Sequence, residues 1–295
     1  MAGDFDDGID FEHRSFWNDA IRRFCRNRLA ITGLAIVGFV LFLAIFADFL
    51  APFPYDHAYF DKVLLEPFQH PDHPLGTDEV GRDYLSRLIY GARTSLTVSL
   101  LVQAIAVLIG VPVGALSGYF GGRIDFAVSR VIDVMTAFPS LLFAILIISV
   151  LEGGLPTIII ALSITGWIGI ARLTRAQFLI LREQEYALAA KALGVPSGKI
   201  IFRDLLLNAL TPILVAVSFG IPGTIFAEAG LSFIGLGIND PLASWGKMVG
   251  VSNAYVRVYW HLAFFPTIAI AMTMLGFSFL GDGLRDALDP KYEDQ

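Results

Sequence analysis

The sequence predicts an all-α membrane protein with six membrane-spanning helices. Of its 295 residues, 55% are hydrophobic and only 16% are charged, and the mean hydropathy is +0.65. This composition is too apolar for an ordinary soluble domain. Helices are expected because backbone polar groups in lipid must be satisfied within their own segment. Six runs without Asp, Glu, Lys or Arg are each long enough to cross about 30 Å of hydrocarbon as a helix: residues 29–47, 94–122, 134–151, 153–171, 205–227 and 258–281.

The distribution of positive charge predicts how these helices are oriented. Fifteen of the 21 Lys and Arg residues fall on one side if both termini are cytosolic, and six fall on the other. The positive-inside rule therefore places both termini in the cytosol of a multi-pass protein of the cell (inner or plasma) membrane. The predicted division is a cytosolic tail (1–28), a first transmembrane helix (29–50), an extracytoplasmic loop (51–93), a five-helix core (94–284) with a cytosolic loop (182–204), and a cytosolic tail (285–295).

The second predicted span carries a stripe of glycines. Gly110, Gly114 and Gly118 recur every four residues, so they lie on one face of a helix and let another helix approach closely. Packing within the chain and contact with another subunit both fit this stripe. Prolines in or near the spans predict local breaks or kinks: Pro112, Pro139, Pro212, Pro222 and Pro266.

The outer loop is rich in histidine and aspartate. His70 and His73 are close enough in sequence to serve as two metal ligands. His and Asp are also common in solvated loops, and no second pair has a comparable spacing. The sequence therefore favours a loop without a metal.

The cytosolic loop contains a short helix that no membrane requirement explains. Residues 185–193 are rich in alanine and leucine, and Gly194 followed by Pro196 should end the helix. Small side chains let a partner surface come close, so we expect a rod lying in a groove. The alternative is a surface helix at the membrane interface.

The segment after the fifth span is too short to cross the membrane. Residues 229–239 are apolar, which predicts a re-entrant or interfacial turn with Gly230, Gly235 and Gly237 in its backbone. Glu228 lies at its edge, where a functional acid and a structural hydrogen-bonding group are both consistent with the sequence.

Enzymatic motifs are missing from the sequence. Residues 194–200 resemble a phosphate-binding loop only faintly, because three residues instead of four separate the glycines and no Ser or Thr follows Lys199. There is no nucleophile elbow, HExxH motif or paired-cysteine site. The sequence thus predicts a chain that is not an enzyme and binds no cofactor itself.

Several motifs resemble those of one transporter family. The cytosolic segment is similar to the coupling loop of type I (importer) ABC transporter permeases, with Ala189, Ala190 and Gly194 at matching positions. The runs HPLGTDEVGRDYLSRLIYGARTSL (73–96), LSFIGLG (231–237) and SWG (244–246) resemble the second permease subunit of the dipeptide and oligopeptide subfamily. This resemblance covers nearly all of the chain from about Arg22.

The resemblance implies a function and a set of partners. The chain would form half of a passage with a second, homologous permease, in contact with membrane lipid and without nucleic acid. Two ATPase subunits would bind ATP and Mg²⁺, and an extracytoplasmic binding protein would deliver peptides or similar solutes. The ATPase-coupling residues would be Glu185, Leu188, Ala189, Ala190 and Gly194. The binding-protein docking residues would be His73, Gly76, Asp78, Gly81, Arg82 and Asp83.

Two positions depart from the family pattern. Position 188 is Leu where the family usually has Glu, and position 207 is Leu where Pro is common. Glu185 lies one turn before Leu188, so we expect it to replace the missing carboxylate in part. The alternative function is a secondary transporter or channel without ATPase partners, which would place ionisable residues inside the membrane. The centres of the six runs contain none.

Overall fold

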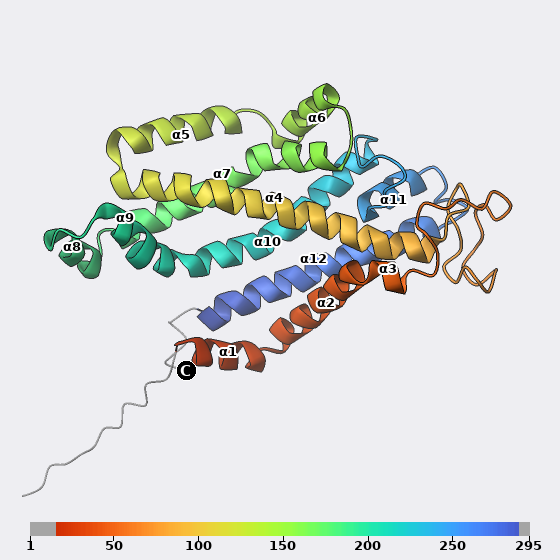
Figure 1. The fold of residues 1–295 in the computed structure, drawn as a ribbon, viewed down its shortest axis with the longest axis horizontal. Helices are drawn as coiled ribbons and strands as arrows, with labels where there is room; N and C mark the ends of the chain where they lie inside the picture. The colour runs from red at the N-terminus through yellow and green to blue at the C-terminus, as the bar shows by residue number, and fades with distance from the viewer. Residues whose placement is uncertain (1–15, 289–295) are drawn as a thin grey trace, which may run out of the picture.

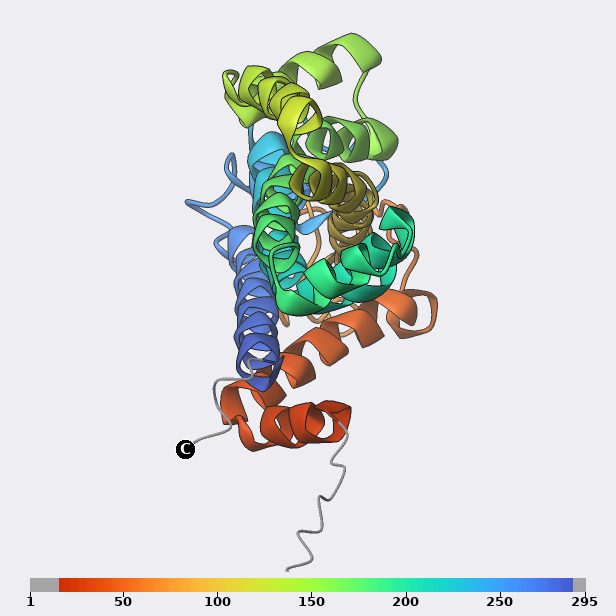
Figure 2. The same ribbon diagram turned by 90° about the vertical axis from the view of Figure 1, so that its left-hand side faces the viewer.

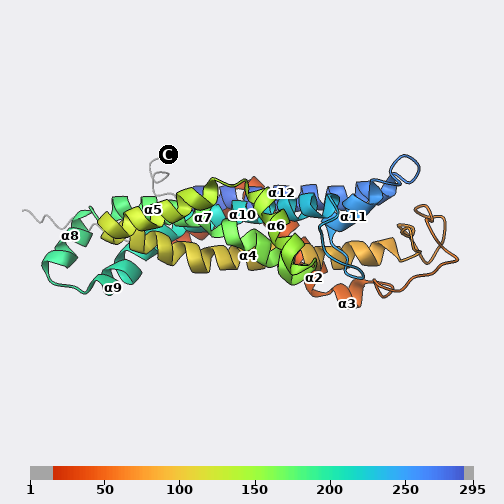
Figure 3. The same ribbon diagram turned by 90° about the horizontal axis from the view of Figure 1, so that it is seen from above.

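The computed structural model describes residues 16–288, and this part of the chain is an elongated bundle of helices without a β-strand (Figures 1–3). Five helices are long and apolar enough to cross a membrane, or six with a bent pair counted as one span. The elements are α1 (Phe16–Arg26), α2 (Arg28–Ile45), α3 (Ala47–Leu50), α4 (Tyr84–Phe120), α5 (Gly122–Thr136), α6 (Ser140–Leu151), α7 (Leu155–Leu181), α8 (Glu185–Ala192), α9 (Ser197–Lys199), the π-helix η1 (Ile200–Leu205), α10 (Leu206–Phe233), α11 (Trp245–Ser252) and α12 (His261–Leu288).

The two ends of the bundle are built differently. Helix α8 projects at one end, and the long loop between α3 and α4 lies at the other, beside α11 (Figure 1). Helix α1 and the last turns of α12 lie towards the α8 end (Figure 1). We call these two ends the α8 end and the loop end.

Part of the predicted N-terminal tail is helical. Residues 1–15 lie outside the described part of the chain, but α1 occupies most of the remainder and packs against α12. Asn27 separates α1 from α2, and its side chain accepts hydrogen bonds from the backbone N–H groups of Leu29 and Ala30. This side-chain cap starts the first membrane helix next to the predicted position.

The second membrane helix begins earlier than residue 94. Asp83 caps α4 by accepting a hydrogen bond from the Ser86 backbone at 2.8 Å, so the helix starts at Tyr84 inside the predicted outer loop. A charge-free run marks only the part of a helix that lipid can cover, and α4 continues beyond it.

The glycine stripe of α4 lies against α7. A Cβ atom added at Gly110, Gly114 or Gly118 would lie 2.7, 2.4 or 2.6 Å from atoms of α7, which is too close for real contacts. The stripe therefore lets the backbones of these two helices approach within the chain, which is one of the two roles left open by the sequence.

The third predicted span is not one straight helix. Helices α5 and α6 meet at an angle of 77°, with Pro139 in the break between them. The apolar helix α6 begins only at Ser140, whereas the predicted run began at residue 134. A proline cannot donate a backbone hydrogen bond, so the predicted break at Pro139 is confirmed, and the third predicted span is a bent pair of helices.

The predicted turn at residues 229–239 is partly helical. Helix α10 continues to Phe233, and only the residues after it form turns, with Gly235 at φ +82°. Pro212 and Pro222 lie inside α10 without ending it. Apolar residues that continue the helical pattern extend the fifth span instead of opening a separate re-entrant loop.

Candidate functional site

The short helix at the α8 end has a well-defined terminus. Its last turn is closed by hydrogen bonds from Gly194 N–H to the Lys191 carbonyl and from Val195 N–H to the Ala190 carbonyl, both at 3.0 Å. Gly194 has φ +74°, the left-handed conformation that this C-terminal motif requires. The predicted helix and its stop at Gly194 are confirmed, with Leu193 as the capping residue.

Most of α8 is exposed. Ala187 alone is buried, in a cluster with Phe178 of α7 and Ile201 of η1. Leu188 is 48% exposed and Leu193 is 84% exposed. The helix is thus held to the end of α7 and to η1 by one side and offers apolar surface on the other, and it lies outside the helices long enough to span a membrane. Such a surface is typical of a protein contact.

The predicted coupling residues lie mainly on this outer surface. Glu185, Leu188 and Ala189 are exposed, and Ala190 is half-buried because it packs against the same cluster as Ala187. Tyr186, which the sequence analysis did not select, is 42% exposed and adds an aromatic ring to the same helix. A large aromatic residue among alanines in this helix was the feature of the sequence that could have identified it.

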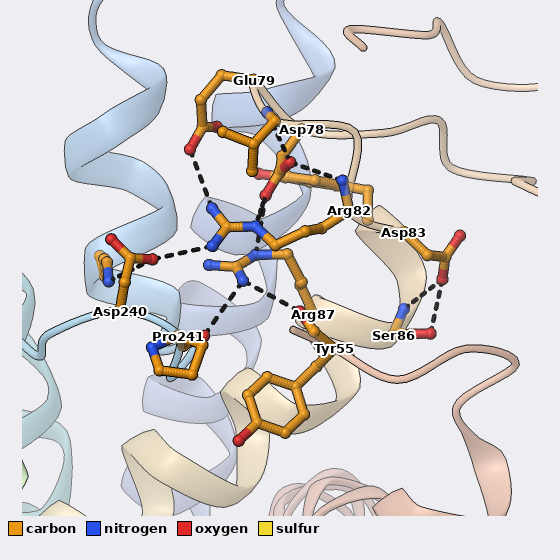
Figure 4. A network of polar contacts seen from close by, with 12 residues as sticks. Tyr55, Asp78, Glu79, Arg82, Asp83, Ser86, Arg87, Asp240 and Pro241 are labelled. Carbon is orange, nitrogen blue, oxygen red and sulfur yellow. Dashed lines mark hydrogen bonds and ion pairs between the residues drawn. The ribbon is translucent and has the colours of Figure 1, made fainter. Parts of the chain in front are cut away.

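A charged network closes the loop end (Figure 4). The Asp78 carboxylate accepts a hydrogen bond from Arg82 Nε at 2.6 Å and lies 3.2 Å from Arg87 Nε. Arg82 also donates to Glu79 at 3.1 Å and to Asp240 at 2.9 Å. These contacts join the turn before α4 to the segment before α11.

Two backbone carbonyls and a lysine complete the network. Arg87 Nη1 donates to the carbonyl oxygens of Tyr55 at 3.2 Å and Pro241 at 3.4 Å (Figure 4). Lys247 Nζ lies 3.0 Å from the Asp240 carboxylate. Both arginine side chains are at most 9% exposed, so the network is a buried structural joint.

Burial and neighbouring charges shift several of these groups. Burial, together with Asp78, raises the pKa of Glu79 above its usual value. Burial lowers the pKa of Lys247, with the positive charges of Arg87 and Arg82 adding to the effect. Burial alone would raise the pKa of Asp240, but hydrogen bonds from Lys247 and Arg82 hold that pKa below its usual value.

The other predicted loop residues belong to the same scaffold. His73 Nδ1 lies 2.9 Å from Asp83 Oδ1, and these two residues are 1% and 0% exposed. Gly76 and Gly81 have φ of +80° and +82°, and a Cβ atom at Gly81 would lie 2.0 Å from the Tyr59 carbonyl oxygen. They therefore hold tight turns.

The six predicted docking residues are all buried in this chain: His73, Gly76, Asp78, Gly81, Arg82 and Asp83. This corrects the expectation that their side chains form a docking surface, because buried groups position a surface without touching a partner. His70 and His73 are likewise not part of any His, Cys, Asp and Glu cluster suited to a metal within residues 16–288.

Glu228 has a structural partner set. Its Oε1 accepts hydrogen bonds from Ser232 Oγ at 2.9 Å and from Ser244 Oγ at 2.7 Å. Ser244 is the N-cap of α11, and its Oγ accepts from Lys247 N–H at 3.1 Å. Glu228 thus fastens the start of α11 to α10, the structural role that the sequence left open.

A cavity of about 200 Å³ lies between four helices in the membrane-spanning part. Its walls come from α4, α6, α7 and α10, and they include Gln103, Thr165 and Thr224. Gln103 Nε2 donates to Thr224 Oγ1 at 3.0 Å. The sequence analysis selected none of these residues. The feature that could have identified them is Gln103, a polar side chain near the middle of the apolar run 94–122.

Comparison with protein families gives two matches. Residues 110–294 match the family described as binding-protein-dependent transport system inner membrane component. Residues 15–71 match the family described as the N-terminal TM domain of oligopeptide transport permease C. Together these matches span most of the chain.

Two curated proteins of Bacillus subtilis (strain 168) are similar over nearly the full length. The oligopeptide transport system permease protein OppC is 44% identical over 98% of this chain and 94% of its own. The dipeptide transport system permease protein DppC is 44% identical over 97% of this chain and 89% of its own.

A solved structure shares the fold. The MetNI methionine ABC transporter, in an inward-facing conformation, aligns with a TM-score of 0.58 and 19% identity, over 69% of this chain and 96% of that chain. This likeness supports the type I importer fold of the helical core.

Proposed function

The chain belongs to the family of binding-protein-dependent transport system inner membrane components, and we propose that it carries dipeptides, oligopeptides or related small solutes as one permease of an ATP-driven importer. Membership of this family makes it a multi-pass inner membrane permease and not an enzyme. It also decides against a secondary transporter or channel that works without partner subunits. The peptide class comes from the relatives named for oligopeptide and dipeptide transport.

The observation that carries the proposal is the exposed face of α8. A capped helix with Leu188 and Leu193 open to solvent lies at one end of the bundle, attached to α7 and to η1 before α10. In the proposed assembly, α8 seats in a groove of an ATPase subunit on the cytosolic side. Because α8 is a short rigid rod between two membrane helices, movement of the groove would be passed directly to α7 and α10.

The remaining partners are proposed from the family, and the two ends of the molecule suit two of them. Both termini would be cytosolic, as the positive-inside rule predicts. A second, homologous permease would supply the other half of the passage, and two ATPase subunits would bind ATP and Mg²⁺. An extracytoplasmic binding protein would dock at the loop end, where Phe60 and Phe68 are 80% and 84% exposed. The buried network from Asp78 to Lys247 would hold that loop in place.

The test is a photo-crosslinker placed at Ala189, which is exposed on α8. Irradiation of intact membranes should link the chain to an ATP-hydrolysing subunit. A crosslinker at Phe68, exposed at the opposite end, is the matched control and should not capture that subunit. Failure of the Ala189 probe to capture an ATPase, with the complex intact, would refute the proposed coupling.

Glu185 offers a second prediction at the same surface. Its exposed carboxylate lies one turn before Leu188 and would pair with a basic group of the ATPase. We expect Glu185→Ala to weaken binding of the ATPase subunit about fivefold, the effect of losing roughly 1 kcal/mol at an interface, and so to lower peptide-stimulated ATP hydrolysis at limiting ATPase concentration. Lys191→Ala, also on exposed α8, is the control. Unchanged coupling in Glu185→Ala would mean that Glu185 does not replace the missing carboxylate.

A further inference from the structure

The cavity between α4, α6, α7 and α10 lies at mid-depth in the bundle. Gln103 is near the middle of α4, and Gly220 is near the middle of α10. Ser140 and Thr165 add hydroxyl groups from α6 and α7, and no charged side chain lines the walls. This cavity of about 200 Å³ is smaller than the roughly 300–1,000 Å³ of pockets that enclose a small ligand, so a solute site here would need a second subunit to complete it.

Gln103 is the most polar group in this wall. The residue is only 8% exposed, and one amide N–H is donated to Thr224. Its Oε1 is not among the fully buried side-chain atoms without a partner in the described part of the chain, and Gln103 lines the cavity. Thr224 keeps a partner of its own, because its hydroxyl donates to the Gly220 carbonyl at 3.0 Å. The Gln103 amide oxygen thus remains available to accept a hydrogen bond from a ligand in the cavity.

Two glycines of α10 shape the space around this amide. A Cβ atom at Gly220 would lie 2.4 Å from Gln103 Oε1, so only glycine leaves room for the side chain in this position. A Cβ atom at Gly223 would meet nothing within 4 Å, although Gly223 lines the cavity. The cavity is therefore kept open where a methyl group would fit without strain.

We propose that this cavity is the chain's part of the solute site and that Gln103 Oε1 accepts a hydrogen bond from a main-chain N–H of a passing peptide. The inference rests on the proposed function and specifies its ligand chemistry. Because the wall carries hydroxyl and amide groups but no charge, it recognises the neutral backbone and not the charged termini or side chains. One permease can then accept peptides of different sequence.

Gly223→Ala tests the site without disturbing the fold. The added methyl group enters the cavity and meets no atom of this chain, and alanine favours a helix over glycine. In cells that carry the variant as their copy of this permease, we expect uptake of radiolabelled tri-alanine to fall at least fivefold with unchanged amounts of the chain in the membrane. Gly38→Ala, a helical glycine of α2 with equally empty space, is the matched control and should keep normal uptake.

Gln103→Leu tests the ligand chemistry. The probes are tri-alanine and its two analogues in which an ester oxygen replaces one or the other of its two peptide N–H groups. We expect the wild type to show a KM about fivefold higher for one of these esters, a difference typical of one hydrogen bond, and Gln103→Leu to remove that preference. An unchanged preference in Gln103→Leu, or normal uptake by Gly223→Ala, would overturn this inference alone. Failure of the wild-type cells to take up tri-alanine in a chain-dependent way would count against the proposed peptide function instead.

Discussion

At the scale of single residues, the loop end depends on charge compensation at Asp78. One carboxylate lies between two arginines, and its Oδ1 also accepts the backbone N–H groups of Val80 and Arg82 at 3.0 and 2.8 Å. The arginines reach Asp240 and Pro241, far along the chain. The sequence identified Asp78 and Arg82, but Asp240 is 158 residues from Arg82 and no local pattern connects them.

We predict that Asp78→Asn destabilises the chain by about 3 kcal/mol. The substitution leaves Arg82 and Arg87 buried without their shared carboxylate, and breaking a buried ion pair typically costs 3–5 kcal/mol. The remaining acids, Glu79 and Asp240, offset part of this loss for Arg82. Thermal unfolding of the purified protein, followed by tryptophan fluorescence, measures the effect.

Glu79→Gln is the matched control for Asp78→Asn. The pKa of Glu79 is raised in the folded protein, which means that folding favours the protonated acid. This contribution to the free energy of unfolding is present at low pH and is lost as pH rises through the folded pKa. Glutamine resembles the protonated acid, and we expect a loss below about 1 kcal/mol. In the wild type, ionisation of Glu79 lowers the free energy of unfolding as pH rises above 4.5, because its pKa is raised in the folded protein. Glutamine does not ionise, so the free energy of unfolding of the variant should fall less over this pH range. Equal losses in both variants would argue against a special role for Asp78.

At the scale of elements, the contact between α4 and α7 depends on a row of three glycines. The glycine stripe of α4 was visible in the sequence as a period of four, but its partner was not. Backbone atoms of α7 fill the space where side chains would project from this stripe. Only the folded chain decides between packing within one subunit and packing between two.

We predict that Gly114→Ala destabilises the chain by about 2 kcal/mol. Its Cβ would lie 2.4 Å from the Ala171 carbonyl oxygen, so the two helices must separate. Gly38→Ala makes the same change where nothing lies within 4 Å, and it should be neutral or stabilise by up to about 1 kcal/mol. Thermal unfolding of both proteins tests this; a neutral Gly114→Ala would show that the α4–α7 contact tolerates a wider spacing.

At the scale of the whole molecule, its two ends must lie on opposite sides of the membrane. The chain contains one cysteine, so Cys25→Ser gives a background for site-specific labelling. We predict that a cysteine at Ala189 is labelled by a membrane-impermeant maleimide only after the cytosolic face is opened. A cysteine at Phe60 should be labelled in intact cells from which any outer barrier has been removed. Labelling of the Ala189 position from outside would overturn the predicted orientation.

The sequence by itself determined the membrane class, the approximate positions of the spans and the short helix from Glu185 that stops before Gly194. These features depend on composition, on the length of apolar runs and on local capping, all of which act between near neighbours. The sequence also indicated the break at Pro139, because a proline acts within one turn of a helix.

Only the tertiary structure decided what the chemically distinctive residues do. It buried the expected docking residues in a joint between distant segments, assigned the glycine stripe to α7, and placed Gln103 at a cavity with Thr224. Each of these outcomes depends on contacts between residues far apart in the chain. Such contacts follow from how whole helices pack, and a linear pattern carries no record of that packing.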